Sequence, residues 1–451
     1  MLSLVRRVLA AVLCSSFGYA AGATPPNLVV IMADDMGYAD LSCYGNDRYQ
    51  TPHIDALARE GLRFTDYHSN GAVCSPTRAA LMTGRYQQRS GVDEVVFADP
   101  ARGKRDDHGL QPTEITFAKL LQAAGYRTAL FGKWHLGYAP KFNPRHHGFD
   151  EFRGYVSGNV DYRSHRDQAD FPDWWRDLAL ADEPGYSTHL ITRHAVRFLE
   201  ENRGRPFCLY VAHEAPHAPY QGPGDPPVRG PQAQPPVSGA GIGRAYREMV
   251  QEMDQGVGEI IATLRRLNLL ENTFVFFCSD NGGTREANNG PLHGFKASVW
   301  EGGHRVPAIA WWPARIKAGT TDQTMLTMDV MPTLLEFAHV AVPAALKLDG
   351  TSVAGLLTGG RPLPARTLFW GYNQRYAVRE GPWKLVVNQP DDAAKGKGKQ
   401  KKAAGSGATG VALYHLGNDL GERTNLAAQE PARVQRMQAA LAAWQKDVGA
   451  K

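Results

Sequence analysis

Four side chains that can bind a metal follow two apolar runs that lie far apart in the chain. They are Asp34, Asp35, Asp280 and Asn281. The preceding runs, residues 27–33 (NLVVIMA) and 273–279 (TFVFFCS), have the composition of buried strands. Adjacent carboxylates at a buried strand end repel each other and favour a cation, and oxygen donors suit Ca2+ or Mg2+ better than zinc. A single Asp in such a place is more often a turn former or a helix cap, but the four together favour a metal site.

Residues 74–85 (CSPTRAALMTGR) hold a second chemical candidate. Pro76 marks a helix start, which places Cys74 at the positive end of the helix, where anions are stabilised. Arg78 follows by about one helical turn and can pair with an anionic oxygen at the same place. A lone cysteine is as often structural as reactive, so the spacing alone leaves both interpretations open.

The elements that must position these residues follow from the pattern between the two apolar runs. Segments with helical periodicity lie at residues 54–61, 115–125 and 188–202. Short apolar runs follow two of them, at residues 127–131 and 207–212. Strands that alternate with helices predict an α/β fold, in which helices cover an open sheet and ligands gather at the carboxyl edge of its strands.

A smaller unit is expected at the end of the chain. Short runs rich in Tyr, Trp and Val alternate there, and residues 375–379 and 383–387 flank a Glu-Gly-Pro turn as a hairpin would. A helical pattern closes the chain. We therefore expect a large domain over residues 24–345 and a C-terminal subdomain of antiparallel sheet plus helix over residues 346–451. A Gly- and Lys-rich loop at residues 389–410 is predicted to be disordered.

The first 23 residues have the pattern of a cleavable signal peptide, with two arginines, an apolar run and small residues. The apolar run, residues 8–13, is much shorter than the ~20 residues that span a bilayer. We therefore expect an exported protein, periplasmic or secreted, without stable membrane insertion. The formal net charge of +5 is too small to favour nucleic-acid binding. Cys208 and Cys278 lie in apolar runs and are predicted to be buried thiols.

The segment that begins at Cys74 resembles the C-x-P-x-R…T-G-R signature of the sulfatases, through Cys74, Pro76, Arg78 and residues 83–85. Other blocks of the same family follow in the family's order. They are Asp34 with Asp35, 132–137 (GKWHLG), 215–219 (APHAP), 280–283 (DNGG) and 294–307 around Lys296 and Glu301. The resemblance covers roughly residues 25–430. It implies an alkaline-phosphatase-like fold with a large mixed, mostly parallel sheet sandwiched by helices, and the hydrolysis of aryl or carbohydrate sulfate esters.

In this family the signature cysteine is oxidised to Cα-formylglycine. The resemblance implies that a formylglycine-generating enzyme converts Cys74 into an aldehyde, which becomes a hydrated gem-diol. One hydroxyl, held by calcium, would attack sulfur while the alcohol leaves. The sulfate would stay on residue 74 until the second hydroxyl loses its proton and the hemiacetal collapses. The cysteine is then a precursor, and its thiol has no catalytic role.

The resemblance also implies roles for the remaining motif residues. The expected ligands of Ca2+, with Mg2+ less favoured, are Asp34, Asp35, Cys74, Asp280 and Asn281. Arg78 would orient the gem-diol, and Lys133 and Lys296 would bind the sulfate oxygens. His135 would be the base of the collapse step, and His217 the acid that protonates the leaving alcohol.

Two other functions on the same fold stay open from the sequence. A phosphomonoester or phosphonate monoester hydrolase would bind a similar tetrahedral oxyanion, but the motifs supply no second metal cluster of His and Asp. A glycan-binding relative without catalysis would carry a damaged nucleophile or metal motif, and neither is damaged.

These motifs do not determine the natural substrate. A segment that can present basic side chains to a sugar contains Arg163, His165 and Arg166. Two tryptophans that follow it, Trp174 and Trp175, fit structural packing at least as well. The histidines without an assigned role are His213, His293 and His304.

Overall fold

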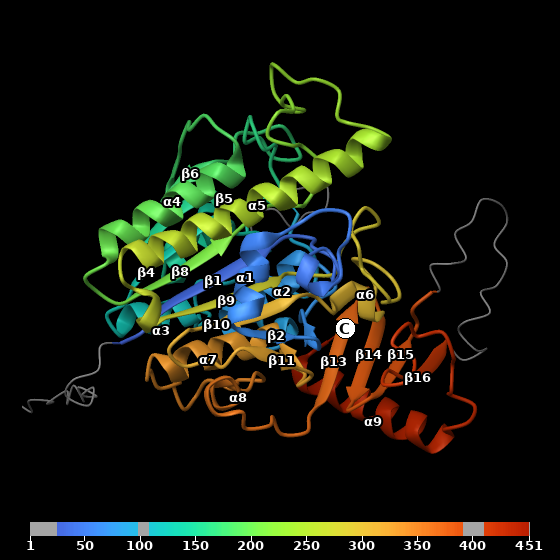
Figure 1. Cartoon of the computed structure of the whole chain (residues 1–451). Coiled ribbons are helices and arrows are strands. Elements are labelled where there is room, and N and C mark those ends of the chain that lie inside the picture. Colours follow the sequence, from blue (N-terminus) through green and yellow to red (C-terminus); the bar gives the residue numbers. More distant parts are fainter. Residues whose placement is uncertain (1–24, 98–107, 391–409, 451) are drawn as a thin grey trace, which may run out of the picture.

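The computed structural model describes residues 25–97, 108–390 and 410–450. The predicted signal peptide, and all but the ends of the predicted disordered loop, lie outside these residues. The described part has a large sheet between two layers of helices and a smaller sheet beside it (Figure 1). Within the three described ranges, none of the helices has the length and hydrophobicity that a membrane span requires.

The large sheet contains the two strands that the apolar runs predict, side by side at its centre. In spatial order its strands are β11 (Gly319–Thr321), β2 (Leu62–Phe64), β10 (Ala308–Trp311), β9 (Thr273–Ser279), β1 (Asn27–Ala33), β8 (Phe207–Ala212), β4 (Arg127–Lys133), β5 (Glu151–Tyr155), β6 (Trp175–Arg176) and β7 (Ala179–Leu180). The strands from β9 to β5 run parallel, and β10 and β6 flank them in the antiparallel sense. The predicted mixed, mostly parallel sheet is confirmed.

Strand β1 shows why this sheet needs helices on both faces. Successive side chains of a strand point to opposite faces, and every residue of β1 is buried. Leu28, Val30 and Met32 pack into a core with the helices of one layer, whereas Val29 and Ile31 pack with those of the other. The first layer contains α2 (Cys74–Thr83), α3 (Phe117–Ala123), α7 (Val330–Phe337) and α8 (Ala354–Gly359). The second contains α1 (Pro52–Glu60), α4 (Ser187–Asn202) and α5 (Ala240–Arg266).

Helix α5 is a 27-residue element that the patterns above do not predict. Its buried side chains include Met249, Met253, Val257 and Ile260, which recur every three to four residues as an amphipathic helix requires. Together with α4 it covers the upper face of the sheet in Figure 1. The Pro- and Gly-rich residues before it hide where the helical pattern begins.

The smaller sheet is antiparallel, as predicted for the C-terminal part. It consists of β13 (Thr367–Tyr372), β14 (Arg375–Glu380), β15 (Trp383–Val387) and β16 (Val411–His415). Helix α9 (Pro431–Val448) packs on it, with the Trp444 ring stacked 5.1 Å from the Phe369 ring. Ala80 of α2 and Met328 belong to the same core cluster, so the small sheet packs directly against the large unit. The predicted boundary at residue 345 stays a prediction.

Candidate active site

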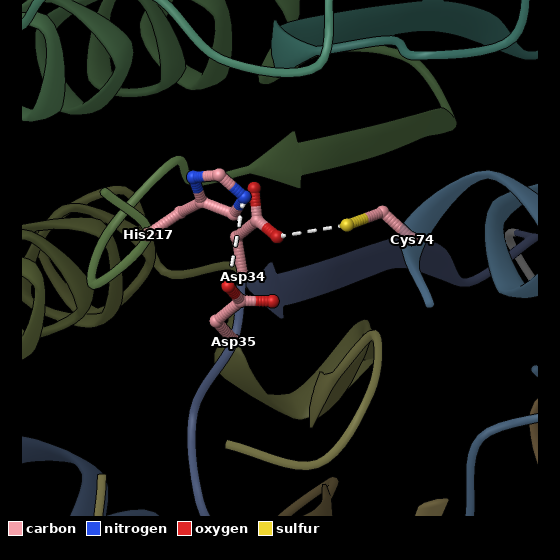
Figure 2. A group of neighbouring side chains, drawn as sticks. All are labelled: Asp34, Asp35, Cys74 and His217. Carbon is pink, nitrogen blue, oxygen red and sulfur yellow. Dashed lines mark hydrogen bonds and ion pairs between the residues drawn. The ribbon is translucent and has the colours of Figure 1, made fainter. Parts of the chain in front are cut away.

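The carboxyl ends of the central strands bring the predicted site residues together. Asp34 and Asp35 follow β1, Asp280 follows β9, and Lys133 is the last residue of β4. Cys74 is the first residue of α2 and faces this edge of the sheet, with His217 on the loop after β8 (Figure 2). Arg78, Asn281 and Lys296 contact the same group, and His135 lines the adjoining pocket with Cys74 and His217.

Close packing of two strands holds Lys133 in place. Gly132, the residue before it, has a φ of 109°, which is a region that favours glycine. A Cβ atom at Gly132 would lie 2.0 Å from the carbonyl oxygen of Ala212 in β8. The glycine of the GKWHLG block therefore lets β4 approach β8, so that Lys133 points into the site.

The acidic residues form a buried group with an unused acceptor. The amide nitrogen of Asn281 donates to Asp35 Oδ1 over 2.7 Å, and the backbone N–H of Asp35 donates to Asp280 Oδ1 over 3.2 Å. Asn281 Oδ1 is buried and has no partner in the described part of the chain. Burial, together with Asp34, raises the pKa of Asp280 to about 6. An orphaned oxygen beside crowded carboxylates fits a hard cation such as Ca2+.

Each of the three carboxylates pairs with a Lys or Arg side chain, of which Lys133 and Arg78 are buried and Lys296 is 20% exposed. Lys133 Nζ lies 2.5 Å from Asp34 Oδ2, and Lys296 Nζ lies 2.6 Å from Asp35 Oδ1. Arg78 donates from Nε and Nη2 to Asp280 Oδ2 over 3.0 and 2.8 Å. The charges balance, so a bound divalent cation would make the site positive and favourable for an anion.

Cys74 lies at the centre of these charges and is 2% exposed. Its Sγ atom is 3.5 Å from Asp34 Oδ1 and 3.4 Å from Lys296 Nζ. Burial alone would raise the pKa of the thiol, but Lys133 and Lys296 outweigh it and lower the pKa to about 7. The start of α2 adds the positive end of a helix dipole. Residue 74 therefore occupies a position that stabilises negative charge on its side chain.

The two predicted proton-transfer histidines differ in their surroundings. Burial lowers the pKa of His217, but Asp35, 3.5 Å from His217 Nε2, and Asp34 together outweigh burial and raise it. Burial and Lys133 hold the pKa of His135 well below its ordinary value. His135 Nδ1 is buried without a partner among the described residues. His217 can therefore hold a proton for donation, and His135 is neutral and can accept one.

A pocket of about 610 Å3 adjoins these side chains and provides room for a substrate. Cys74, His135, His217 and Lys296 line it on one side. Lining residues that the sequence patterns do not single out include Arg285, Tyr372, Asn373 and Arg375. The last three belong to the hairpin of β13 and β14, whose turn residues Asn373 and Gln374 both have positive φ. Such a turn is visible in sequence only weakly, and its position over the pocket depends on how the two sheets pack.

The three basic side chains that we expect could reach a sugar contact other parts of the protein. The His165 ring stacks on Trp174 at 4.5 Å, and Arg163 lies over the Tyr186 ring at 5.5 Å. The side chains of Arg163, His165 and Arg166 do not belong to the pocket lining. Trp174 is 2% exposed and donates from Nε1 to Glu183 over 3.1 Å. The packing interpretation of Trp174 agrees with this geometry.

His304 belongs to a buried charged cluster between the two sheets, which we call the interdomain cluster. Its members are Asp66, His68, Glu301, His304, Arg305, Arg379, Lys384 and Glu422. Lys384 Nζ of β15 lies 2.9 Å from Glu301 Oε1 and 3.2 Å from His304 Nε2. The His304 ring stacks on Trp370 of β13 at 4.4 Å. His68, Glu301 and His304 have the spacing of metal ligands, but the Lys384 ammonium already supplies the positive charge there.

Comparisons with known proteins agree on one family. A model of the sulfatase family matches residues 26–340. N-acetylgalactosamine-6-sulfatase of Canis lupus familiaris is 32% identical over 92% of this chain and 84% of its own length. Arylsulfatase A of Bos taurus is 36% identical over 81% of this chain and 75% of its own length. The crystal structure of Ps i-CgsB, also known in complex with k-i-k-neocarrahexaose, has a TM-score of 0.79 and 29% identity, with 93% of each chain covered.

Proposed function

Because this chain belongs to the sulfatase family and is a sulfuric ester hydrolase, we propose that it cleaves sulfated glycans with a formylglycine made from Cys74. The position of Cys74 carries the proposal. Its Sγ atom, which marks the place of the formylglycine oxygens, contacts both an acidic metal-binding group and the ammonium of Lys296. A nucleophilic oxygen there would lie beside the ligands of a cation and beside a cation for the sulfate.

Other residues of the site bind the sulfate, transfer protons and orient residue 74. Lys133 and Lys296 hold the sulfate oxygens, where charge rearranges in the transition state. The hydrated formylglycine at residue 74 would supply the oxygen nucleophile that displaces the sugar oxygen from sulfur. His217 protonates that leaving oxygen. His135, which is neutral, would accept a proton from modified residue 74 when sulfate is released. Arg78 orients residue 74 through its contact with Asp280.

A calcium ion fits the acidic group of this site. Asp34, Asp35, Asp280 and Asn281 would hold it, with an oxygen of modified residue 74. The free Asn281 Oδ1 supports this assignment. Calcium, when bound, would act as a Lewis acid that lowers the pKa of a hydroxyl group.

The substrate class rests on the relatives. One is named for a sulfated amino sugar, and another has been crystallised with k-i-k-neocarrahexaose. The signal-peptide pattern of residues 1–23 supports export, to the periplasm or beyond. A formylglycine-generating enzyme is then needed during maturation.

The proposal is tested by three measurements on the mature protein. Intact-mass analysis should show the deficit that accompanies conversion of the Cys74 thiol to an aldehyde. An aryl sulfate and a matched aryl phosphate should then be compared, and kcat/KM should be higher for the sulfate. The Cys74→Ala variant should release no sulfate while it keeps the wild-type circular dichroism spectrum. A higher kcat/KM on the phosphate, or unchanged sulfate release by Cys74→Ala, would reject the proposed function.

A further inference from the structure

The substrate pocket is lined by basic side chains beyond those assigned to the sulfate. Among its described lining residues, the charged side chains other than histidine are Lys296, Arg285 and Arg375, and none is acidic. Lys296 already pairs with Asp35 at the bottom of the site. The two arginines therefore leave the pocket with positive charge that the proposed sulfate chemistry does not use.

Each arginine contacts one of the two residues that flank Lys296 in the chain, Phe295 or Ala297. The Arg285 guanidinium lies 4.8 Å from the ring centroid of Phe295. Arg375 Nη1 donates to the backbone carbonyl of Ala297 over 3.1 Å. Arg285 follows the DNGG block after β9, whereas Arg375 begins β14 of the small sheet. Two separate parts of the fold thus place a guanidinium beside the lysine that we assign to the sulfate.

Neither guanidinium has a carboxylate partner within the described ranges, although Arg78, Arg89 and Arg366 each pair with an Asp. Arg375 uses one nitrogen for the Ala297 carbonyl, and Arg285 makes only its contact with the Phe295 ring among the described residues. A guanidinium offers five N–H donors in a planar fork that matches a carboxylate or a sulfate. An unpaired fork beside a pocket gains most from an anionic ligand group.

We propose that Arg285 and Arg375 form an anionic subsite, which binds a second carboxylate or sulfate of the substrate beside the ester that is cleaved. The inference rests on the proposed function and narrows it to polyanionic glycans. A sugar sulfate with a uronate carboxylate, or with a second sulfate, supplies the required oxyanion. A sugar sulfate without a second anionic group leaves both guanidinium groups without an anionic partner in the substrate.

The test uses three disaccharides that carry the same sulfated sugar. The neighbouring sugar is neutral in the first, carries a carboxylate in the second and carries a sulfate in the third. For the mature wild-type enzyme, kcat/KM for at least one anionic substrate should exceed the neutral one by about tenfold to hundredfold, since a hydrogen bond to a charged group contributes about 1.5–3 kcal/mol. The two anionic substrates show whether the subsite prefers the carboxylate or the sulfate.

The variants are Arg285→Gln, Arg375→Gln and the double variant. Each should lower the preference for the anionic substrate, mainly through KM, and Arg375→Lys should restore part of it. Arg265→Gln is the matched control, because Arg265 is exposed at the end of α5 and is not part of the pocket lining. It should leave the preference unchanged.

Two results would overturn the subsite: a wild-type enzyme without preference for anionic substrates, or a preference that survives in the double variant. If the mature enzyme cleaves no sulfate ester at all, the proposed function fails separately. Calorimetric binding of the third disaccharide to the wild type and the double variant then decides the subsite, and equal affinities reject it.

Discussion

Replacement of Lys384 by Met removes a single positive charge from the interior of the interdomain cluster. Lys384 is fully buried, and its Nζ atom lies 2.9 Å from Glu301 Oε1 and 2.9 Å from Glu422 Oε1. Met fills a similar volume but leaves the buried Glu422 carboxylate without a cation among the described residues, whereas Glu301 keeps Arg305 Nη1 at 3.2 Å. Removal of one partner from a buried ion pair costs about 3–5 kcal/mol, because the other charge stays buried without compensation. We expect a loss of this size in the free energy of unfolding.

The loss in the free energy of unfolding should depend on pH, because the pKa of Glu422 is raised. Burial and the neighbouring Glu301 together raise the pKa of Glu422 to about 7, although Lys384 opposes this rise. A carboxyl whose folded pKa is higher than its unfolded value stabilises the fold fully below the unfolded value, about 4.5. That stabilisation is lost as the pH rises through the folded pKa. Without Lys384 the folded pKa rises further, so the cost of the substitution should be smaller at pH 5.5 than at pH 8.

Urea unfolding followed by tryptophan fluorescence measures this cost, since Trp370 and Trp383 belong to the small sheet. Hydrogen exchange of the β13–β16 amides should accelerate by about 10^2-fold or more, at 1.4 kcal/mol per factor of ten. The control is Lys347→Met. Lys347 pairs with Asp447 over 2.8 Å, but these side chains are 60% and 51% exposed, and the loss should stay below about 1 kcal/mol.

A second variant separates charge from packing. Lys384→Met combined with Glu422→Gln removes the carboxylate that has lost its cation and should recover part of the lost stability. The reasoning is refuted if Lys384→Met unfolds within about 1 kcal/mol of the wild type. It is also refuted if the exposed control loses as much, or if the cost is the same at both pH values.

Three further predictions concern the active site. Calcium chelation should abolish ester hydrolysis and lower the melting temperature, and added Ca2+ should restore both better than Mg2+; activity that survives exhaustive chelation argues against the metal site. Lys133→Met should lower kcat by about 10^2–10^3-fold, since it removes a buried donor to the sulfate; a change confined to KM contradicts that role. His217→Ala should slow the cleavage of a sugar sulfate at least about tenfold more than that of a nitrophenyl sulfate, whose leaving group needs no proton; equal losses in kcat exclude His217 as the acid.

The sequence predicts the parts of this molecule that depend on continuous local patterns. β1 and β9 are recognisable because every residue of each run is buried, which leaves no polar interruption. The oxygen donors that follow them could be grouped because parallel strands end at one edge of the sheet. The hairpin of β14 and β15 follows from its Gly-Pro turn and from its β-branched and aromatic residues.

Features that arise from packing between distant segments could not be predicted. Lys384 has the sequence surroundings of a solvated strand residue, and only the contact with Glu301 and Glu422 makes it a buried cation. Arg375 likewise enters the pocket because the small sheet packs against α2. Arg163 and His165 attract notice through their charge and spacing, yet His165 stacks on Trp174 and neither side chain lines the pocket.

The turn between β13 and β14 lies at the rim of the pocket, whereas the strands that it joins belong to the core of the small sheet. Asn373 and Gln374 are exposed at the tip, while Trp370 and Ala377 of the same strands are buried in the core. Exchange of the tip changes the rim of the pocket without loss of a core contact, provided that the new residues accept positive φ. Gene duplication followed by drift at this turn would therefore give relatives with new glycan preferences and an unchanged catalytic centre.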